Sequence, residues 1–256
     1  MKIRFLGTHN SESEKSRLSS LIIDDRLVVD AGALSGTLPP ELYTHPASIL
    51  ITHAHYDHIR DIPAVAMNAA LTGRYLNIYA TAGVREALAS HLLNGRLYPT
   101  FLETPADNPI IRFTEVTPSN HFTVPGYQIL PLTMTHGQSA VGYLITGEEG
   151  KSVLVTGDTG PSLADCWPLV NPDGLITEVT MPNRDEQQAL AHNHLTPALL
   201  AKILREFRKD KGYLPRVLAV HLNPWEEETI LTELTAAGRE LNHPLEATHE
   251  GMEITV

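Results

Sequence analysis

Short apolar runs alternate along the chain with turn residues, and this pattern predicts a mixed α/β fold. Runs rich in Val, Ile and Leu, bounded by Gly, Pro, Asp or Asn, are typical of strands. Such runs lie at 2–6, 20–23, 27–30, 48–52, 76–79, 126–135, 142–146, 152–156, 174–178, 216–221 and 252–256. Helical patterns occur at 62–71, 83–93, 161–169, 197–210 and 225–237.

Several short signals fix where these elements start or turn. Thr196 followed by Pro197 is the N-cap and first-turn pattern of a helix. Asp24 with Asp25, and "GEEG" at 147–150, indicate hairpin turns. The Pro-rich stretch 97–109 predicts a long loop.

Length and charge narrow the class of protein. The chain has 256 residues, of which 42% are hydrophobic, so it can bury a large core. We expect a single domain over 1–256. The net charge is −11 and the Lys and Arg residues are scattered, which argues against a stable complex with nucleic acid. A small anionic substrate stays compatible, because bound metal ions can outweigh the overall charge.

The cysteine count and the apolar runs bear on the cellular setting. The single cysteine, Cys166, allows no disulfide within the chain and no thiolate zinc site. The start of the sequence lacks the long apolar segment of a signal peptide, and no run approaches the ~18 residues that cross a membrane. We therefore expect a cytoplasmic protein with no membrane partner.

Four strand-like runs end on a histidine or an aspartate. "SILITH" ends at His53, "ILPLTMTH" at His136, "SVLVTGD" at Asp158 and "RVLAVH" at His221. In α/β folds, sites assemble beyond the carboxyl ends of strands. These side chains are therefore expected to converge on one point.

The stretch "HAHYDH" carries the strongest chemical signal. His53, His55, Asp57 and His58 supply nitrogen and oxygen ligands that suit Zn²⁺, Mn²⁺ or Fe. They are too crowded for one ion, but alternate residues of an extended loop can hold one ion and the next pair a second. Two such ions activate a bridging hydroxide, and Asp158 is the natural carboxylate to bridge them.

The order of these motifs resembles the metallo-β-lactamase superfamily. The match includes H-x-H-x-D-H, the isolated His136, "TGDTG" around Asp158 and the later His221, with "FLGT" and "VVDAG" before them. The resemblance implies a four-layer αβ/βα sandwich. It also implies two metal ions, most simply Zn²⁺, with Asp158 between them. His53, His55 and His136 would hold the first ion, and Asp57, His58 and His221 the second.

Four smaller motifs are also present: "HIRDIP", "GDTGP", "HNHLTPALL" and "HLNPWEEE". They are similar to those of the class II cyclic-nucleotide phosphodiesterases and their bacterial relatives. The resemblance implies hydrolysis of 3′,5′-cAMP or cGMP to the 5′-monophosphate by a metal-bridging hydroxide. His194 would protonate the leaving 3′-oxygen, Glu178 would orient His194, and Asp57 counts as catalytic as well as a ligand. Asn193 departs from the small residue of many relatives, and the segment after "HIRDIP" lacks the fuller eukaryotic pattern.

The remaining titratable residues are assigned lesser roles. Asp30 is expected to orient a ligand histidine or to cap a turn, and His9 is a candidate for the pocket lining. Cys166 is expected to pack as a small residue. The histidines with no pattern behind them are expected to be surface or ordinary polar residues: His45, His91, His121, His192, His243 and His249.

Two alternative functions stay open from the sequence. The first is another hydrolase on the same metals, acting on tRNA 3′ ends, aryl phosphodiesters, arylsulfates or lactones. The second is a nucleotide sensor without turnover. A homodimer is also open, with the apolar face of the helix at 225 as a candidate contact.

Overall fold

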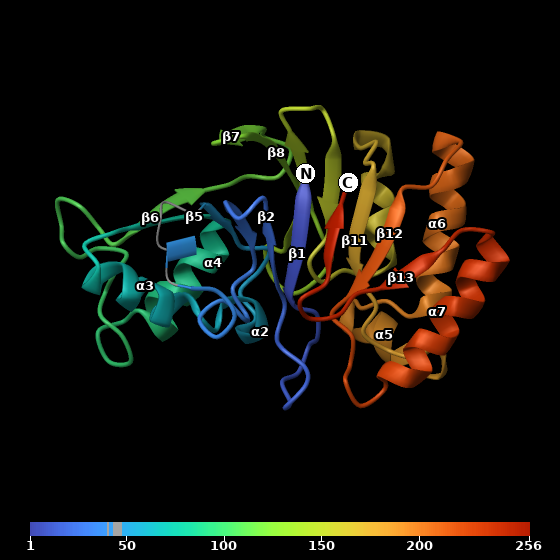
Figure 1. Cartoon of the computed structure of the whole chain (residues 1–256), viewed down its shortest axis with the longest axis horizontal. Coiled ribbons are helices and arrows are strands. Elements are labelled where there is room, and N and C mark those ends of the chain that lie inside the picture. The colour runs from blue at the N-terminus through green and yellow to red at the C-terminus, as the bar shows by residue number, and fades with distance from the viewer. Residues whose placement is uncertain (40, 43–47) are drawn as a thin grey trace.

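The computed structural model describes residues 1–39, 41–42 and 48–256. The expectation for His45 therefore lies outside the described residues. Figure 1 shows the first half of the chain at one side of the molecule and the second half at the other, with the two termini side by side.

Two seven-stranded sheets form the centre of the molecule. The first has the order β14-β1-β2-β3-β4-β5-β6 and the second β13-β12-β11-β10-β9-β8-β7. In both sheets a block of four strands is parallel, β3 to β6 and β10 to β13. The strands are β1 (Lys2–Gly7), β2 (Ser20–Ile23), β3 (Leu27–Val29), β4 (Ser48–Leu50), β5 (Leu76–Ala80), β6 (Ile111–Glu115), β7 (Phe122–Val124), β8 (Tyr127–Thr133), β9 (Val141–Gly147), β10 (Ser152–Val155), β11 (Gly174–Glu178), β12 (Arg216–Val220), β13 (Leu245–Ala247) and β14 (Glu253–Thr255).

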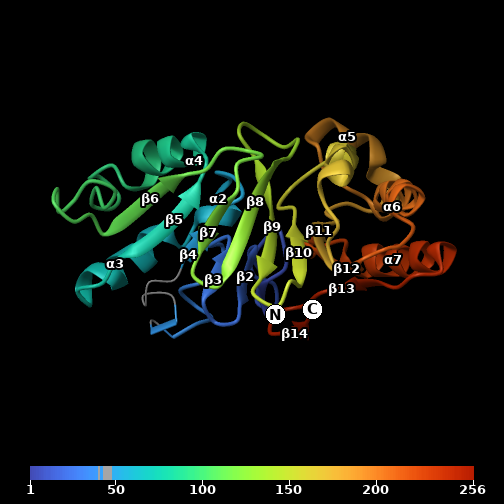
Figure 2. The ribbon, with the colours of Figure 1, turned by 90° about the horizontal axis from the view of Figure 1, so that it is seen from above.

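Helices cover the outer face of each sheet. Figure 2 shows α3 and α4 beside the first sheet and α5, α6 and α7 beside the second. The helical segments are α2 (Tyr56–Ile59), α3 (Ile62–Leu71), α4 (Ala82–Ala87), a π-helix (Leu88–Leu92), 3₁₀ segments (Pro161–Leu169 and Asn183–Asp185), α5 (Glu186–His192), α6 (Pro197–Lys211) and α7 (Glu227–Leu241).

Three apolar cores fill the spaces between these four layers. Alternation along β2 shows how: Leu21 and Ile23 enter the core between the sheets, while Ile22 enters the core under α3 and α4. A third core lies between the second sheet and α6 with α7, and includes Trp167 and Phe207. Period-two strands with two buried faces require this layering. The predicted four-layer α/β sandwich is confirmed.

The capping and turn signals are confirmed. The Thr196 hydroxyl accepts from the Leu199 amide at 3.3 Å, Pro197 opens α6, and Gly212 ends it with φ of 79°. Asp24 and Asp25 both have positive φ between antiparallel β2 and β3, as a type I′ turn requires.

The missed elements share a physical reason. Strands β6, β7 and β13 were not predicted; all three lie at sheet edges, and only one residue of each is buried. Helix α5 was also missed, because Ala189 is its one buried residue and leaves no apolar periodicity.

Three predicted elements differ in kind from the expectation. Residues 56–59 form the helical turn α2 where an extended loop was expected. The predicted helix 161–169 is a 3₁₀ segment that contains Pro168. The helix expected at 83–93 starts as α4 and continues as a π-helix. Within the described part of the chain, no helix is both long and apolar enough to cross a membrane.

Candidate dinuclear metal centre

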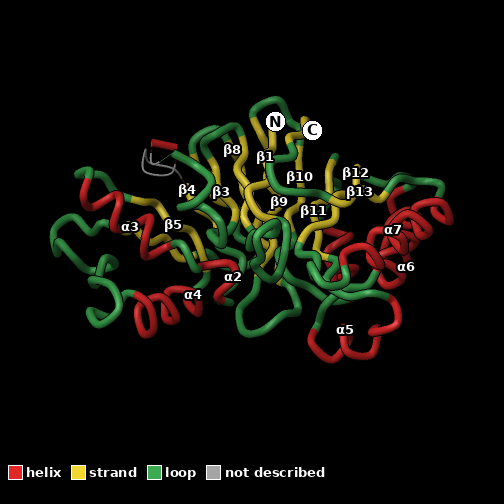
Figure 3. The backbone as a smooth tube through the Cα atoms, turned by 60° about the horizontal axis from the view of Figure 1, so that its bottom comes forward, coloured by secondary structure: helices red, strands yellow, loops and turns green. Residues whose placement is uncertain are grey.

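The predicted ligands gather where strands of both sheets end. His53 follows β4 of the first sheet, while His136, Asp158 and His221 follow β8, β10 and β12 of the second. Each lies one to three residues beyond its strand. Figure 3 shows the loops of the two halves meeting at this edge, between the helices on either side.

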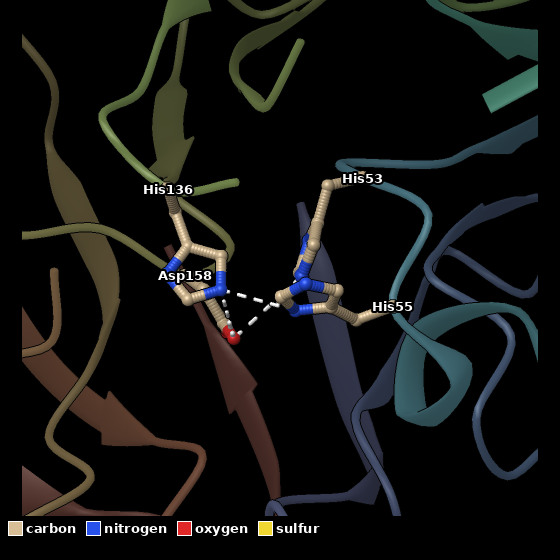
Figure 4. Close-up of side chains that lie close together, drawn as sticks. All are labelled: His53, His55, His136 and Asp158. Atoms are coloured by element: carbon tan, nitrogen blue, oxygen red, sulfur yellow. Dashed lines mark hydrogen bonds and ion pairs between the residues drawn. The ribbon is translucent and has the colours of Figure 1, made fainter. Parts of the chain in front are cut away.

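The donor atoms of the predicted metal ligands form two groups that share one carboxylate. All donor atoms of a group lie within 4.8 Å of one another. One group is His53, His55, His136 and Asp158, and the other is Asp57, His58, Asp158 and His221. Figure 4 shows the four side chains of the first group pointing toward one another. The grouping coincides with the ligand sets that the family resemblance implies, and ligation of ions by them is taken up as a proposal below.

Asp158 lies at the centre of both groups. Its Oδ2 is 3.7 Å from His53 Nε2, 3.6 Å from His136 Nε2 and 3.4 Å from His221 Nε2. Its Oδ1 is 3.3 Å from His58 Nε2. One carboxylate can therefore offer an oxygen to each of two ions.

Most of the clustered histidines have the other ring nitrogen engaged away from the centre. His58 Nδ1 bonds to Asp30 Oδ2 at 2.8 Å, and His136 Nδ1 bonds to the Asn193 carbonyl at 3.2 Å. The partners of His53 Nδ1 and His221 Nδ1 are the hydroxyls of Thr52, at 3.1 Å, and Thr180, at 2.8 Å. Such contacts orient metal-binding histidines and leave Nε2 for the ion. The expected orienting contact of Asp30 is confirmed.

The residues present fit a divalent cation. Among the described residues, His53 Nε2, His58 Nε2 and Asp158 Oδ1 are buried polar atoms without a hydrogen-bond partner. Buried polar atoms are costly unless they are paired or bind a metal. Imidazole nitrogens and carboxylate oxygens suit Zn²⁺, Mn²⁺ and Fe. Two such ions would give these buried atoms a binding partner.

The electrostatics of the centre point the same way. Burial opposes charge on Asp158, but the imidazoles of His221 and His58 outweigh it and hold the pKa of this carboxyl well below its usual range. Burial likewise opposes charge on His58, but Asp158 and Asp30 raise its pKa well above the ordinary value. Burial and the neighbouring His58 lower the pKa of His53. The Asp158 carboxyl is therefore an anion at neutral pH, which suits a group that holds cations.

Two glycines let the backbone close tightly around the centre. In "VVDAG", a Cβ on Gly32 would lie 2.1 Å from the Asp57 carbonyl oxygen. In "TGDTG", Gly157 has φ of +61°, and a Cβ there would lie 2.7 Å from Thr52 Cβ. His221 itself has φ of 60°, an uncommon conformation for a non-glycine residue that recurs at functional sites.

The buried Glu178 pairs with the half-buried His194 beside the two donor groups. His194 Nδ1 lies 2.7 Å from Glu178 Oε1, and Glu178 is fully buried at the end of β11. Burial lowers the pKa of His194, but the bond to Glu178 outweighs it and the pKa is raised. The His194 ring is 4.7 Å from the His136 ring and 5.7 Å from the His221 ring. His194 therefore borders the donor groups.

Glu178 is saturated with hydrogen bonds. It accepts from the Thr159 amide at 2.9 Å, the Leu195 amide at 3.2 Å and the Thr180 hydroxyl at 2.6 Å. Because Thr180 also contacts His221 Nδ1, one carboxylate holds His194 directly and His221 through a hydroxyl. Thr180 and Thr52 were not predicted as site residues; their positions, two residues after Glu178 and directly before His53, were the available signal.

Other sequence expectations have varied outcomes. Asn193, the departure from many relatives, has φ of 56° and ends α5, a conformation that Asn adopts more easily than most residues. His9 is buried against Glu250 at 2.7 Å and lies outside both donor groups. Of the histidines expected at the surface, His91, His121, His192 and His249 are exposed, while His243 is half-buried against the Pro215 carbonyl. Cys166 is buried as expected.

Comparison with known families agrees with the fold and the donor set. The family model described as "Beta-lactamase superfamily domain" matches residues 26–222, which include every residue of the two donor groups. The chain therefore belongs to the β-lactamase superfamily, and its two-sheet architecture is the metallo-β-lactamase fold. It is a hydrolase of this superfamily, and the predicted resemblance is confirmed.

Two of the relatives carry names with different activities. The chain is 27% identical over 282 residues to a ribonuclease Z of Streptococcus suis, covering 88% of this chain and 90% of that protein. It is 25% identical over 202 residues to a probable 3′,5′-cyclic-nucleotide phosphodiesterase of Yersinia pestis, covering 69% and 57%. The structure of unliganded yeast PDE1 superposes with a TM-score of 0.80 at 16% identity, covering 100% of this chain and 99% of that one, which shows a shared fold.

Proposed function

We propose that the protein is a metal-dependent phosphodiesterase that hydrolyses a small cyclic nucleotide, 3′,5′-cAMP or cGMP, to the 5′-monophosphate. The observation that carries the proposal is the contact of the half-buried His194 with the buried Glu178, beside two groups of metal-type donors. A hydrolase that cleaves an ester with a poor, alkoxide leaving group needs an acid at this place. The relative from Yersinia pestis supports the choice of substrate.

The two ions would be held by the donor groups that share Asp158. His53, His55 and His136 would hold the first, and Asp57, His58 and His221 the second. When bound, divalent ions in such a pair supply Lewis-acid stabilisation of the phosphoryl oxygens and an activated water. Zn²⁺ suits the donor set best, because nitrogen ligands dominate it, and Mn²⁺ or Fe are compatible.

The protein's own residues would protonate the leaving group. Glu178 holds the Nδ1 proton of His194, so Nε2 carries the transferable proton of the imidazolium. A hydroxide derived from water forms a new bond to phosphorus while the bond from phosphorus to the 3′-oxygen breaks. The His194 proton passes from Nε2 to that leaving oxygen, which gives a 3′-hydroxyl and a 5′-monophosphate. Three other donors also bond to Glu178 and hold its carboxyl group in position. Asp57 Oδ2 lies 3.0 Å from His221 Nε2, close enough for both atoms to hold the second ion.

A ribonuclease Z activity is the second candidate, because relatives with that name align over most of this chain. The net charge of −11 favours the smaller substrate, since phosphate contacts dominate nucleic-acid affinity. The single-domain organisation over 1–256, the cytoplasmic setting and a homodimer remain predictions.

Side-by-side kinetics separate these candidates. Zinc-loaded protein is given 3′,5′-cAMP, 3′,5′-cGMP and a precursor tRNA with a 3′ trailer, and kcat/KM is compared. We expect the cyclic nucleotides to be hydrolysed and the tRNA to remain intact. Cleavage of the tRNA alone would transfer the assignment to ribonuclease Z, and tight cyclic-nucleotide binding without product would indicate a sensor.

A further inference from the structure

A cavity opens directly beside the first donor group. It has a volume of about 390 Å³ and is lined by His53 and His55 on one side. Its other walls include Glu86, Ser90 and His91 from α4 and the π-helix, and Gln138 from the loop after β8. Pockets for small organic ligands span roughly 300–1,000 Å³. The cavity is therefore large enough for more than the phosphodiester group.

One helical face builds the outer wall. Glu86 and Ser90 are four residues apart and lie on the same face, while Val84 and Leu88 on another face are buried in the core. The wall changes from α-helix to π-helix at Leu88, and π-helical turns occur often at functional sites. Core packing thus fixes the helix and leaves a polar face toward the cavity.

The polar groups of this wall are available to a ligand. Glu86, Ser90 and His91 are exposed. Within the part of the chain that the structure describes, their side chains make no hydrogen bond or ion pair. A carboxylate accepts hydrogen bonds from amino groups, and a hydroxyl and an amide can both donate and accept. The carboxylate also disfavours a second phosphate in the same space.

We propose that this cavity binds the base of a purine mononucleotide whose phosphodiester lies at the donor groups. Glu86 would accept from the exocyclic amino group, and Ser90 and Gln138 would complete the hydrogen bonding of the ring edge. Specificity for the base would thus depend on four residues that line the cavity, Glu86, Ser90, His91 and Gln138. The proposal rests on the proposed function and adds to it where the base lies and which class of base is taken.

Binding calorimetry tests the cavity without turnover. Zinc-loaded wild-type protein is titrated with 5′-AMP and with ribose 5-phosphate, which lacks the base. We expect 5′-AMP to bind at least about tenfold more tightly. Ser90→Trp, which fills the cavity, should bring the two affinities within about twofold. Arg85→Trp is the matched control, because Arg85 is exposed on the same helix and does not line the cavity.

Kinetics with two substrates distinguish an error in the cavity proposal from an error in the proposed function. The ratio of kcat/KM for 3′,5′-cAMP to that for 4-nitrophenyl methyl phosphate, which has no base, should fall about tenfold in Ser90→Trp and in Glu86→Ala, and stay unchanged in Arg85→Trp. If cAMP is hydrolysed but neither ratio nor affinity changes in Ser90→Trp, the cavity proposal is wrong and the function stands. If cAMP is not hydrolysed but the base preference disappears in Ser90→Trp, the function is wrong and the cavity stands. Equal affinity of wild-type protein for both ligands overturns the cavity proposal.

Discussion

At the scale of single residues, the site depends on which atoms lack a partner and which have several. His53 Nε2 and His58 Nε2 are buried without a hydrogen-bond partner among the described residues, whereas Glu178 accepts from four groups. A buried nitrogen without a partner at the centre is suited to bind an ion. A carboxylate outside the centre that accepts several hydrogen bonds holds its neighbours in position. The side chains that would bind metal can therefore be distinguished from those that position the binding side chains.

Replacing His194 tests the acid role. His194→Ala should lower kcat for 3′,5′-cAMP by about 10²–10⁴, the usual contribution of a general acid. The loss should be much smaller for an ester with a 4-nitrophenolate leaving group, which departs without a proton. Zinc content, measured by mass spectrometry, should stay at the wild-type value.

The neighbouring histidine provides the control for that experiment. His192→Ala, two residues away, removes an exposed imidazole bonded to the Gln188 carbonyl, and both substrates should be turned over at the wild-type rate. An equal loss for the two leaving groups in His194→Ala would show that His194 is structural.

The His9–Glu250 pair should give a pH-dependent contribution to stability. Burial lowers the pKa of His9, but Glu250 and Glu227 outweigh it and the pKa is raised from 6.5. Burial raises the pKa of Glu250, but the bond to His9 outweighs it and the pKa is lowered from 4.5. The His9 contribution is complete below about pH 6.5 and is lost as pH rises through the raised pKa; the Glu250 contribution is complete above about pH 4.5 and is lost as pH falls through the lowered pKa.

Urea unfolding of His9→Gln in the presence of a chelator measures this contribution. Near pH 5.5 the substitution should lower the free energy of unfolding by about 1.5–3 kcal/mol, the range for hydrogen bonds to charged groups. Near pH 9 the loss should be smaller. The same loss at both pH values would contradict a charged pair.

At the scale of elements, local sequence signals predicted correctly those turns and helix starts whose structure has a single chemical cause. Thr196 and Pro197 start α6 by capping, and Asp24 with Asp25 turn the chain between β2 and β3. The strand ends that carry His53, His136, Asp158 and His221 were also readable from sequence. Edge strands such as β6 and the helix α5 were not, because their solvent-facing side chains carry no period.

The tertiary contacts of the site could not be predicted from the sequence, for a different reason. The bond from Thr180 to His221 joins two strand ends 41 residues apart, and the bond from His136 to the Asn193 carbonyl joins loops 57 apart. No local pattern specifies which strands become neighbours. The polar wall of α4 likewise becomes a cavity lining only when the loop after β8 packs opposite it.

Removing the cap of α6 should weaken the element that supports the His194 loop. Thr196 is fully buried, and Thr196→Ala leaves the Leu199 amide without its acceptor. The expected cost is about 1 kcal/mol, and the melting temperature should fall by about 2–4 °C in a calorimetric scan. Thr232→Ala, an exposed threonine within α7, should change stability by less than about 0.5 kcal/mol. Equal effects of the two substitutions would argue against the cap.

At the scale of the whole molecule, the candidate metal centre lies where the two halves of the sandwich meet. The donors of the "HAHYDH" segment follow β4 of the first sheet, and His136, Asp158 and His221 follow strands of the second. Ions held between them would link the sheets. The family match ends at residue 222, so it covers the segments that bring these donors together.

Zinc should therefore stabilise the entire fold. At free zinc of 100 times Kd, each ion should add about 2.7 kcal/mol to the free energy of unfolding. Asp158→Asn should remove most of this gain, because Asp158 belongs to both donor groups. Asp173→Asn, which breaks an exposed pair with Lys151, should retain it. Denaturant unfolding with and without zinc provides the comparison, and a full gain in Asp158→Asn would contradict the shared carboxylate.

The most direct measurement is a zinc titration of chelated protein in the presence of 3′,5′-cAMP, followed by phosphorus NMR. The account predicts that 5′-AMP appears only after zinc is added and that its rate of formation levels off at two ions per chain. Product formation without metal, or no product with two ions bound, would contradict the account of a dinuclear cyclic-nucleotide phosphodiesterase.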